Sequence, residues 1–448
     1  MIRFARSRRL AVPVALALVL GLGGCGILGG KGKTHSTPTT GKRIPILSQI
    51  DTAAELDPEL ASIAVVLPPA TPNPDWPQPG GAASKSYGNL ALSSSPARIW
   101  TASIAGSSKR QRLAASPVIG DGQLFAMDTN GVLHAFDAAT GQAHWTHSFR
   151  LPVKSVNSVF GGGASYDSGH VYVTTGLGEV SSLDSRTGAE QWRVKIPEPL
   201  RGAPTLSYGS VFVMTQNNEI YALNAADGSP VWNETASIGQ AGVFGVAAPA
   251  AAQGTVIAGY STGELVAYRY ENGRQLWSDA LARTSLATTV GVLTDIDADP
   301  IIDHGRVYAL GQGGRMAAYE LVSGQRIWEL NLAGISTPAV AGDWIFALTD
   351  DARLLCIART TGKVRWSTQL EHYRNPGKKS GPVFWAGPVL AGDRLWMGNS
   401  LGEIWSASAA DGKPLELTRV GSSISLAPVV ANATIYVLDD SGRINAFR

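Results

Sequence analysis

The hydrophobic positions of this chain come in short alternating runs that turn residues separate. Residues 116–149, SPVIGDGQLFAMDTNGVLHAFDAATGQAHWTHSF, show the full unit, in which the turns GDG, TNG and AATG separate four apolar runs. Alternation with a period of two residues between glycine-containing turns is typical of β-strands. The unit therefore predicts four short strands that form one antiparallel sheet.

The last turn and strand of this unit recur along the chain. A glycine precedes a tryptophan by four residues in six segments, which end at Trp145, Trp192, Trp232, Trp277, Trp328 and Trp366. A type I turn that closes with a left-handed residue favours glycine at that position. We expect the tryptophan ring to cover the joint between neighbouring sheets, with its N–H reaching a backbone carbonyl.

Counting the units predicts the architecture. Eight apolar stretches begin a unit, namely SPVI, GASY, APTL, APAA, DPII, TPAV, GPVL and APVV. The seventh unit carries Glu416 where tryptophan is expected, and the eighth stops at Arg448 before a fourth strand. The segment SPARIW, which ends at Trp100, can supply that strand. Residues 96–448 are therefore predicted to be all-β, an eight-bladed propeller of four-stranded antiparallel blades that an N-terminal strand closes.

The N-terminus has the features of a lipoprotein signal. Four arginines precede a 13-residue apolar run, which is too short to span a bilayer comfortably and ends in LGGC. Residues 1–24 are therefore predicted to be a signal peptide and Cys25 the lipidated residue. An ordinary secretory peptide with an unrelated cysteine is the alternative. Residues 25–95 are rich in proline, glycine and polar residues, and are predicted to be a flexible tether.

The charge balance argues against a nucleic-acid-binding protein, and the cysteine content limits the possible thiol chemistry. The chain has 37 basic and 35 acidic residues, and the predicted signal peptide holds four of the arginines and no acid. The mature chain would be slightly acidic, without the basic character expected of a nucleic-acid-binding protein. With Cys25 lipidated, Cys356 in RLLCIA is the remaining thiol and is expected to be a buried small hydrophobic residue.

One face of the propeller is expected to carry the binding site. Residues 282–299 and 371–385 are insertions between an outer strand and the next inner strand, and these connections share one face. Asp295, Asp297 and Asp299 concentrate charge there. Three interpretations stay open, a metal site, solvated loop acids and a docking patch for a basic partner. Pro300 argues against the metal, since it stands where an EF-hand loop requires glycine.

No set of catalytic residues is evident. The seven histidines are scattered, and neither HExxH nor CxxCH occurs. We therefore expect a protein that is not an enzyme and that carries no cofactor or metal.

The pattern A-x-D-x-x-T-G-x-x-x-W resembles the repeat of pyrroloquinoline-quinone propellers over roughly residues 96–448. The dehydrogenases of that superfamily have an adjacent pair of cysteines, and this chain has none. Together with LGGC, the repeats resemble the BamB-type lipoproteins of the outer-membrane β-barrel assembly machinery. The segments WPQPGG and SIAGSSKRQRLAASPVI are similar to those of members from alphaproteobacteria.

This resemblance implies a scaffold that binds the periplasmic domains of the barrel subunit BamA, next to other assembly subunits. A further hypothesis, which rests on the fold alone, is that exposed blade edges hold strands of nascent outer-membrane proteins by β-augmentation. The resemblance also implies that Asp295 and Asp297 match an acidic pair that takes part in binding. The arginine of the family, in a Leu–Arg–Gly run one blade earlier, falls at Phe244. That departure puts part of the interface in doubt. Gly26 after Cys25 implies an anchor in the outer membrane that faces the periplasm.

Two other functions fit the sequence less well. A cell-wall or polysaccharide-binding lipoprotein would use the many aromatic residues, although the repeat accounts for most of the tryptophans. A periplasmic quinoprotein dehydrogenase would use the fold but lacks the cysteine pair.

Overall fold

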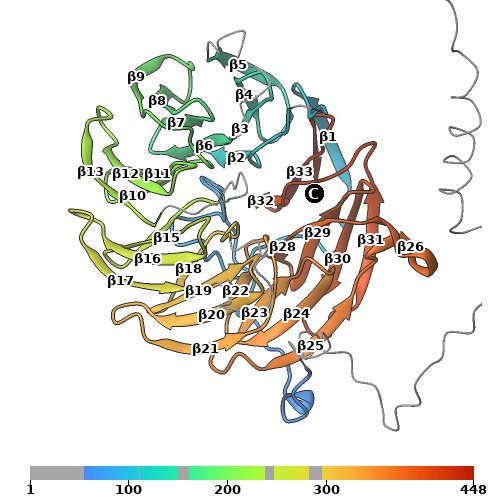
Figure 1. Cartoon of the computed structure of the whole chain (residues 1–448). Helices are drawn as coiled ribbons and strands as arrows, with labels where there is room; N and C mark the ends of the chain where they lie inside the picture. The colour runs from blue at the N-terminus through green and yellow to red at the C-terminus, as the bar shows by residue number, and fades with distance from the viewer. Residues whose placement is uncertain (1–54, 110, 150–160, 238–246, 282–294) are drawn as a thin grey trace, which may run out of the picture. The chain divides into compact units, whose positions relative to one another are not determined.

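The computed structural model describes residues 55–109, 111–149, 161–237, 247–281 and 295–448. The predictions for the signal peptide, Cys25 and Phe244 lie outside these residues. Within them, eight four-stranded antiparallel sheets follow one another around a ring, as Figure 1 shows. This arrangement confirms the predicted eight-bladed propeller.

Each of the first seven blades runs from an inner to an outer strand in chain order. Blades 1 to 3 are β2–β5 (Val118–Gly120, Gln123–Met127, Val132–Asp137, Ala143–Ser148), β6–β9 (Gly162–Asp167, His170–Thr175, Glu179–Asp184, Glu190–Lys195) and β10–β13 (Thr205–Ser207, Ser210–Met214, Glu219–Asn224, Pro230–Thr235). Blades 4 to 6 are β14–β17 (Ala250–Ala252, Thr255–Gly259, Glu264–Arg269, Gln275–Ala280), β18–β21 (Ile301–Asp303, Arg306–Gly311, Arg315–Glu320, Arg326–Leu330) and β22–β25 (Ala339–Ala341, Trp344–Leu348, Arg353–Ala358, Val364–Gln369). Blade 7 is β28–β31 (Trp385–Ala391, Arg394–Asn399, Glu403–Ser408, Pro414–Arg419).

The eighth blade joins the two ends of the propeller. It contains β32 (Val429–Ala431), β33 (Thr434–Leu438) and β34 (Arg443–Phe447), and its outer strand is β1 (Arg98–Ser103). β1 pairs antiparallel with β34, with Trp100 opposite Ala446. The predicted closure by an N-terminal strand is therefore confirmed. β1 thus covers the edge of β34 that would otherwise be unpaired at the outer side of the last blade.

Burial along the strands follows the sequence pattern. All five residues of β11 are buried, whereas β13, the outer strand of the same blade, alternates between exposed and covered residues. Cys356 lies in β24 and is fully buried, as predicted, and burial raises the pKa of its thiol. No helix in the described part of the chain is long and apolar enough to cross a membrane.

The repeated tryptophans hold neighbouring blades together, as predicted. Trp232 of blade 3 donates its indole N–H to the carbonyl of Tyr270 in blade 4 at 2.7 Å. Its ring covers Gly273, where a Cβ would lie 2.7 Å from the ring and where φ is +71°. The glycine thus serves both the turn and the joint. The same bond recurs in the described residues from Trp100, Trp145, Trp192, Trp277, Trp328 and Trp366 to Ala138, Ser185, Ala225, Leu321, Arg359 and Ala409.

The closure of the ring explains why Glu416 replaces a tryptophan. Each of these tryptophans packs on a glycine in the turn between the third and fourth strands of the next blade, as Trp366 does on Gly412. Blade 8 has no such turn, because its third strand ends the chain and its fourth strand is β1. A ring at position 416 would have no glycine to cover. Glu416 instead pairs with Arg419 at 2.9 Å on the surface.

The prediction that residues 25–95 form a flexible tether is wrong for the described residues that enter the ring. Trp76 is 4% exposed and Leu90 is 3% exposed, both within the largest apolar cluster of the molecule. Composition alone suggested a solvated segment, but Trp76 and Leu90 are buried by blades far away in sequence, whereas Leu56, Ile63 and Val66 nearer the start are exposed. Figure 1 shows this part of the chain, in blue, at the centre of the ring.

Residues 73–90, here called the channel segment, bind to the inner strands of successive blades. An inner strand has one edge without a partner in its own sheet, and the channel segment supplies hydrogen bonds to that edge. The contacts join Asn73 to Val430 and Asn432, Trp76 to Ile119, Pro77 to Tyr166, Gln78 to Leu206, Ala83 to Ala251, Ser84 to Ile302, and Leu90 to Leu390 and Gly392. They reach blades 8, 1, 2, 3, 4, 5 and 7 in that order.

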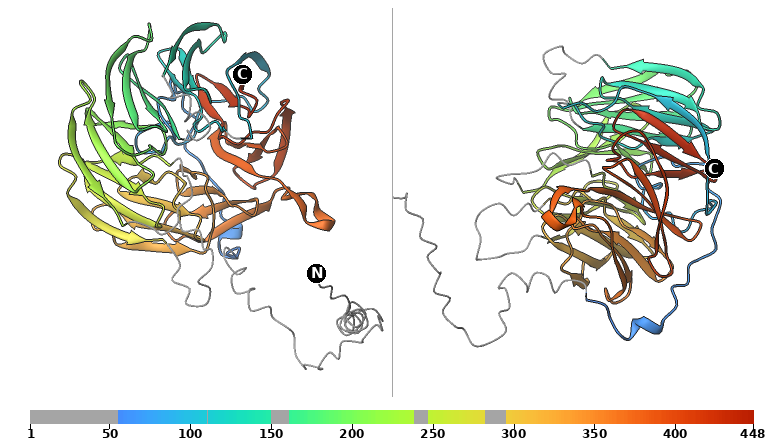
Figure 2. Two further views of the ribbon diagram at one scale, coloured as in Figure 1. Left: turned by 45° about the horizontal axis from the view of Figure 1, so that its top comes forward. Right: turned by 90° about the vertical axis from the view of Figure 1, so that its right-hand side faces the viewer.

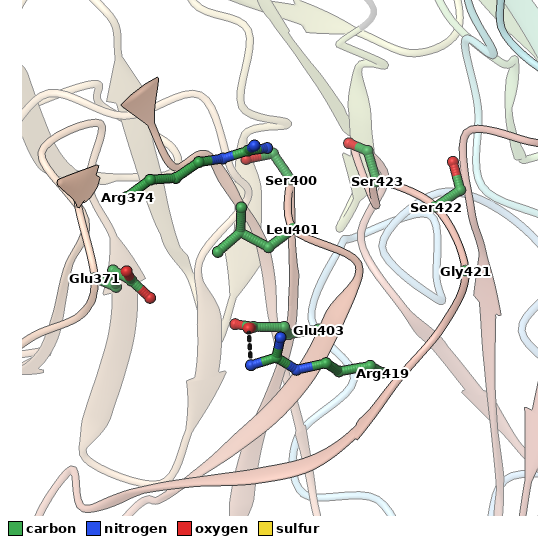
Figure 3. A pocket seen from close by; sticks show the side chains of 9 residues that line it. All are labelled: Glu371, Arg374, Ser400, Leu401, Glu403, Arg419, Gly421, Ser422 and Ser423. Atoms are coloured by element: carbon green, nitrogen blue, oxygen red, sulfur yellow. Dashed lines mark ion pairs between the residues drawn. The ribbon is translucent and has the colours of Figure 1, made fainter. Parts of the chain in front are cut away.

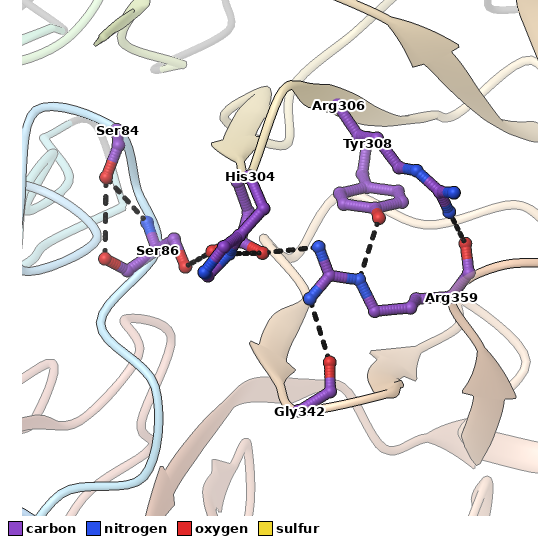
Figure 4. A network of polar contacts seen from close by, with 8 residues as sticks. Ser84, Ser86, His304, Arg306, Tyr308, Gly342 and Arg359 are labelled. Carbon is purple, nitrogen blue, oxygen red and sulfur yellow. Dashed lines mark hydrogen bonds and ion pairs between the residues drawn. The ribbon is translucent and has the colours of Figure 1, made fainter. Parts of the chain in front are cut away.

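A polar network fixes the channel segment to blades 5 and 6 (Figure 4). Ser86 donates to Asp303 at 2.7 Å, and the same carboxylate pairs with Arg359 at 2.6 Å. Arg359 also donates to the carbonyl of Gly342 at 2.8 Å and to the hydroxyl of Tyr308 at 3.2 Å. The segment is therefore held by charge-assisted bonds as well as by apolar packing.

Two further elements lie outside the blades. A short helix, η2 (Leu60–Ser62), belongs to a stretch that begins beside the outer strand of blade 6, where Leu56 bridges Val364. The hairpin of β26 (Tyr373–Asn375) and β27 (Ser380–Pro382), with η3 (Pro376–Lys378) at its tip, projects from the ring between blades 6 and 7 (Figures 1 and 2).

Candidate functional site

Asp295 and Asp297 lie in the connection that leads into blade 5, with Ile296 fully buried between them. They do not form a solvated patch. The side chain of Asp295 is 1% exposed and that of Asp297 is 12% exposed. Two carboxylates in such a position require a cation close by, because burying unpaired charge is costly.

Arg201 provides that cation. Its Nη2 lies 2.9 Å from Asp295 and 3.1 Å from Asp297, and its own side chain is 1% exposed. The residue comes from the connection between blades 2 and 3, where its backbone N–H donates to Met214 and its carbonyl accepts from Gly162. Nε and Nη1 have no hydrogen-bond partner in the described part of the chain. Arg201 therefore reaches from a hydrogen-bonded backbone in the connection between blades 2 and 3 to both acids.

Sequence reasoning missed Arg201, although a signal was present. The Leu–Arg–Gly run that the family resemblance calls for one blade before the acids occurs here at residues 200–202, in an earlier connection. The prediction followed the repeat register and so placed the arginine position at Phe244, which lies outside the described residues. The structure shows that an arginine from a different connection reaches the acidic pair.

Two more buried charges adjoin this pair. Asp299 is 9% exposed and accepts a hydrogen bond from the N–H of Ala248 at 2.8 Å. Lys85 of the channel segment is 1% exposed and donates to the carbonyl of Pro79 at 3.0 Å and to Thr205 at 3.2 Å. Burial lowers the pKa of Lys85 to about 8, against the opposing effect of Asp299.

The electrostatics of the three acids differ. Burial raises the pKa of Asp297 to about 6, the Asp295 carboxylate adds to the increase, and Arg201 opposes it. Burial likewise raises the pKa of Asp299, and Lys85 opposes that increase. Three carboxylates thus face two cations in a part of the ring from which water is largely excluded.

These positions decide between the open interpretations of the three acids. Solvated loop acids are excluded for Asp295 and Asp299 by their burial. Within the described ranges, no group of three or more His, Cys, Asp or Glu side chains is arranged to hold a metal ion. A partner-binding role stays a prediction, with Asp297 as the most accessible of the three.

A cavity of about 250 Å³ occupies the channel next to the acids. The channel segment contributes Trp76, Pro79, Gly80 and Tyr87 to its lining, and blade 5 contributes Asp297 and Asp299. The remaining lining comes from residues 114–118, Ala203, and residues 335–337, 385–389 and 425–429.

A second hollow lies at the surface between blades 7 and 8 (Figure 3). It measures about 500 Å³ and contains both charges, with Arg419 paired to Glu403 at 2.6 Å. Arg374, from the β26–β27 hairpin, extends toward Ser400 in the same view. The hollow is open and its charges are largely balanced, so it selects no evident class of ligand.

The residues present do not fit the quinone cofactor of the related dehydrogenases. The sequence has no adjacent cysteines, and Cys356, buried in blade 6, is the free cysteine of the described part of the chain. The channel cavity is lined by the carboxylates of Asp297 and Asp299, which do not favour an anionic quinone.

Comparison with known proteins places the chain in a family. The family described as outer membrane protein assembly factor BamB matches residues 88–159 and 129–368. The protein of that name from Yersinia pestis is 28% identical over 358 residues, covering 79% of this chain and 89% of the relative.

Solved structures agree in fold. The crystal structure of BamB from Moraxella catarrhalis matches with a TM-score of 0.65 and 19% identity, covering 79% of this chain and 99% of that one. Quinohemoprotein alcohol dehydrogenase from Comamonas testosteroni matches with a TM-score of 0.68 and 15% identity, covering 89% and 84%. The fold is thus shared by the assembly factor and the dehydrogenase. The sequence, by contrast, matches the family model of the assembly factor. By its family match over more than half of its length, the chain belongs to the outer membrane protein assembly factor BamB family.

Proposed function

We propose that this protein is a non-enzymatic scaffold of the machinery that assembles outer-membrane β-barrel proteins, and that it binds the periplasmic domains of the BamA subunit. The membership of the BamB family carries this proposal. We further propose that Cys25 carries the lipid anchor in the outer membrane and that the propeller lies in the periplasm.

The architecture supports a scaffold. A ring whose blades are joined by repeated tryptophan bonds, and whose centre is held by the channel segment, presents a preorganised surface. Preorganisation lowers the entropy lost on binding, and a lipid anchor raises the local concentration of the ring near a membrane-bound partner. Most of the 12 tryptophans are used in the joints, which weakens the case for a sugar-binding surface.

The geometry divides the roles of the two acids. Asp295 is buried against Arg201 and fixes the position of the connection, whereas Asp297 retains an exposed part. We therefore assign contact with the partner to Asp297 and a positioning role to Arg201 and Asp295. Phe244 stays a predicted contact.

The test is an affinity capture of BamA from detergent-solubilised envelopes by the full-length lipoprotein. Asp297→Lys reverses a partly exposed charge and can be compared with Asp227→Lys. Asp227 lies in a turn between third and fourth strands, which strand order places on the opposite face of the ring. Equal thermal stability of the two variants makes the comparison valid.

Each outcome of this capture supports or rejects the proposed function, the role of Asp297, or both. Capture by the parent and by Asp227→Lys, but not by Asp297→Lys, supports both the function and the site. Capture by all three keeps the function and rejects the role of Asp297. Capture by none rejects the function, and retention on peptidoglycan would then favour the wall-binding alternative.

The absence of enzymatic activity is tested separately. Reconstitution with pyrroloquinoline quinone and calcium, followed by desalting, should leave no cofactor absorbance with the protein. Retained absorbance at one quinone per chain would contradict the proposal.

A further inference from the structure

The cavity in the channel has an amphipathic lining. Asp297 and Asp299 lie at one side, and Trp76, Tyr87, Trp385 and Leu426 supply apolar surface elsewhere. Trp76 and Tyr87 pack on each other with ring centroids 4.9 Å apart. A volume of about 250 Å³ is far above the roughly 10–15 Å³ that one water requires on this measure. Such a space, with few polar groups among apolar walls, is typical of a small-molecule site.

The two acids have unused capacity toward this cavity. Asp299 accepts one hydrogen bond at Oδ1, from the N–H of Ala248. Asp297 accepts one at Oδ1, from Arg201. Neither Oδ2 accepts a hydrogen bond from the residues that the structure describes, although both residues line the cavity. Each acid therefore has an acceptor oxygen that the described residues leave free, and both acids line the cavity, so a ligand in the cavity can supply the donor.

The charge balance indicates which charge that donor carries. Asp295, Asp297 and Asp299 face Arg201 and Lys85, and the Asp350 carboxylate also acts on Asp297, so negative charge is in excess when all these groups are ionised. A neutral donor would leave this excess, and an anion would increase it. A positive charge reduces it, and the indole rings of Trp76 and Trp385 in the cavity lining are of a type that attracts cations.

We propose that the channel cavity binds a monovalent organic cation, an ammonium or guanidinium group on a small apolar body. Its charged group lies between Asp297 and Asp299, and its apolar part packs on Trp76 and Trp385. A divalent metal fits less well, because the described residues provide no set of three ligating side chains. This site differs from the partner-binding role of Asp297, since it includes Asp299 and the aromatic residues of the channel.

The cation can come from a free amine or from an arginine side chain of another protein. Two probes separate these sources. Phenethylamine represents the free amine, and N-acetyl-arginine methylamide represents the side chain, since only its guanidinium is charged. Tighter binding of the first indicates a metabolite-type amine, and tighter binding of the second indicates a protein side chain.

The experiment is titration calorimetry of the full chain with three probes that share one apolar body. Phenethylamine should bind. 2-Phenylethanol should bind about tenfold more weakly or worse, because it cannot form a charge-assisted hydrogen bond. 3-Phenylpropionate should not bind measurably, because the acids of the cavity repel its carboxylate. Equal binding of the alcohol or the acid, or no binding of either cation, overturns the proposal. Binding of calcium without binding of the amines overturns it as well.

Variants locate the site. Asp299→Asn keeps the shape of the side chain and its acceptor for Ala248, and should weaken phenethylamine binding at least tenfold. Ala427→Trp places a large ring at an exposed part of the cavity lining and should block entry without repacking the core. Asp227→Asn, on an exposed turn, is the matched control and should bind as the parent does. Unchanged binding in both site variants, with melting temperatures equal to that of the parent, places the amine elsewhere and rejects the proposal.

Discussion

The joints between blades and the centre of the channel are both buried, but they are built in opposite ways. Each joint repeats one neutral arrangement, an indole over a glycine with one hydrogen bond to the next blade. The channel brings together single residues, Lys85, Arg201 and Asp299, from segments far apart in the sequence. The repeated joints stabilise the whole ring. The charged cluster occurs once, and burying its charges costs desolvation free energy that the rest of the fold offsets. We therefore propose that the binding site lies at the channel rather than at the tryptophans.

The largest expected effect comes from breaking a joint. Trp232→Ala removes a buried ring and its bond to Tyr270, and should lower the free energy of unfolding by about 4 kcal/mol. Glu416→Ala is the matched control, because it stands at the same repeat position without a glycine to cover, and should cost less than about 1 kcal/mol. Urea unfolding of both variants measures the difference. Similar losses would show that the joint is not the source of stability.

The next largest effect concerns the charged cluster. Arg201→Met leaves Asp295 buried without a cation and should cost about 3 kcal/mol. Adding Asp295→Leu should recover part of this loss, because the uncompensated charge is then removed. The double-mutant cycle is followed by denaturant unfolding at neutral pH. A strictly additive loss would mean that the two side chains do not interact as the structure shows.

A smaller effect distinguishes a docked channel segment from a loose one. Gln78 donates to the carbonyl of Leu206 and accepts from its N–H at 2.9 Å. Gln78→Ala leaves both backbone groups unpaired and should cost about 2 kcal/mol. Ser95→Ala, at an exposed position of the same N-terminal stretch, should have no measurable effect. Hydrogen exchange at Leu206 should speed up in the first variant alone, and equal exchange in both would contradict the docking.

The smallest effect is a pH dependence. The pKa of Asp297 is about 6 in the folded protein against 3.8 for the ordinary carboxyl group, so the folded state holds this proton more tightly. Stability from this group is present below about pH 4 and is lost as the pH rises through about 6. Asp297→Asn, which cannot titrate, should remove this loss of stability. Urea unfolding of parent and variant between pH 4 and 7 measures the difference between their slopes, and identical slopes would exclude this assignment.

The sequence by itself determined the parts of the molecule that repeat. The glycine and tryptophan spacing predicted the blades, their number, the closing strand before residue 103 and the indole bond across each joint. Each of these depends on contacts within a blade or between neighbours, so a local pattern contains the information. The acidic pair was also found, because two acids in one short connection are adjacent in sequence.

Only the tertiary structure decided what occupies the centre. The path of residues 73–90, the pairing of Arg201 with Asp295 and the burial of Lys85 join segments separated by dozens to hundreds of residues. Composition assigned the N-terminal stretch to solvent because it has few apolar residues, yet closing the ring creates an inner edge with unpaired backbone groups that binds it. The role of Glu416 became clear only when blade 8 was seen to lack the turn that a tryptophan would cover. The local repeat thus specified the blades, and ring closure specified the site that they enclose.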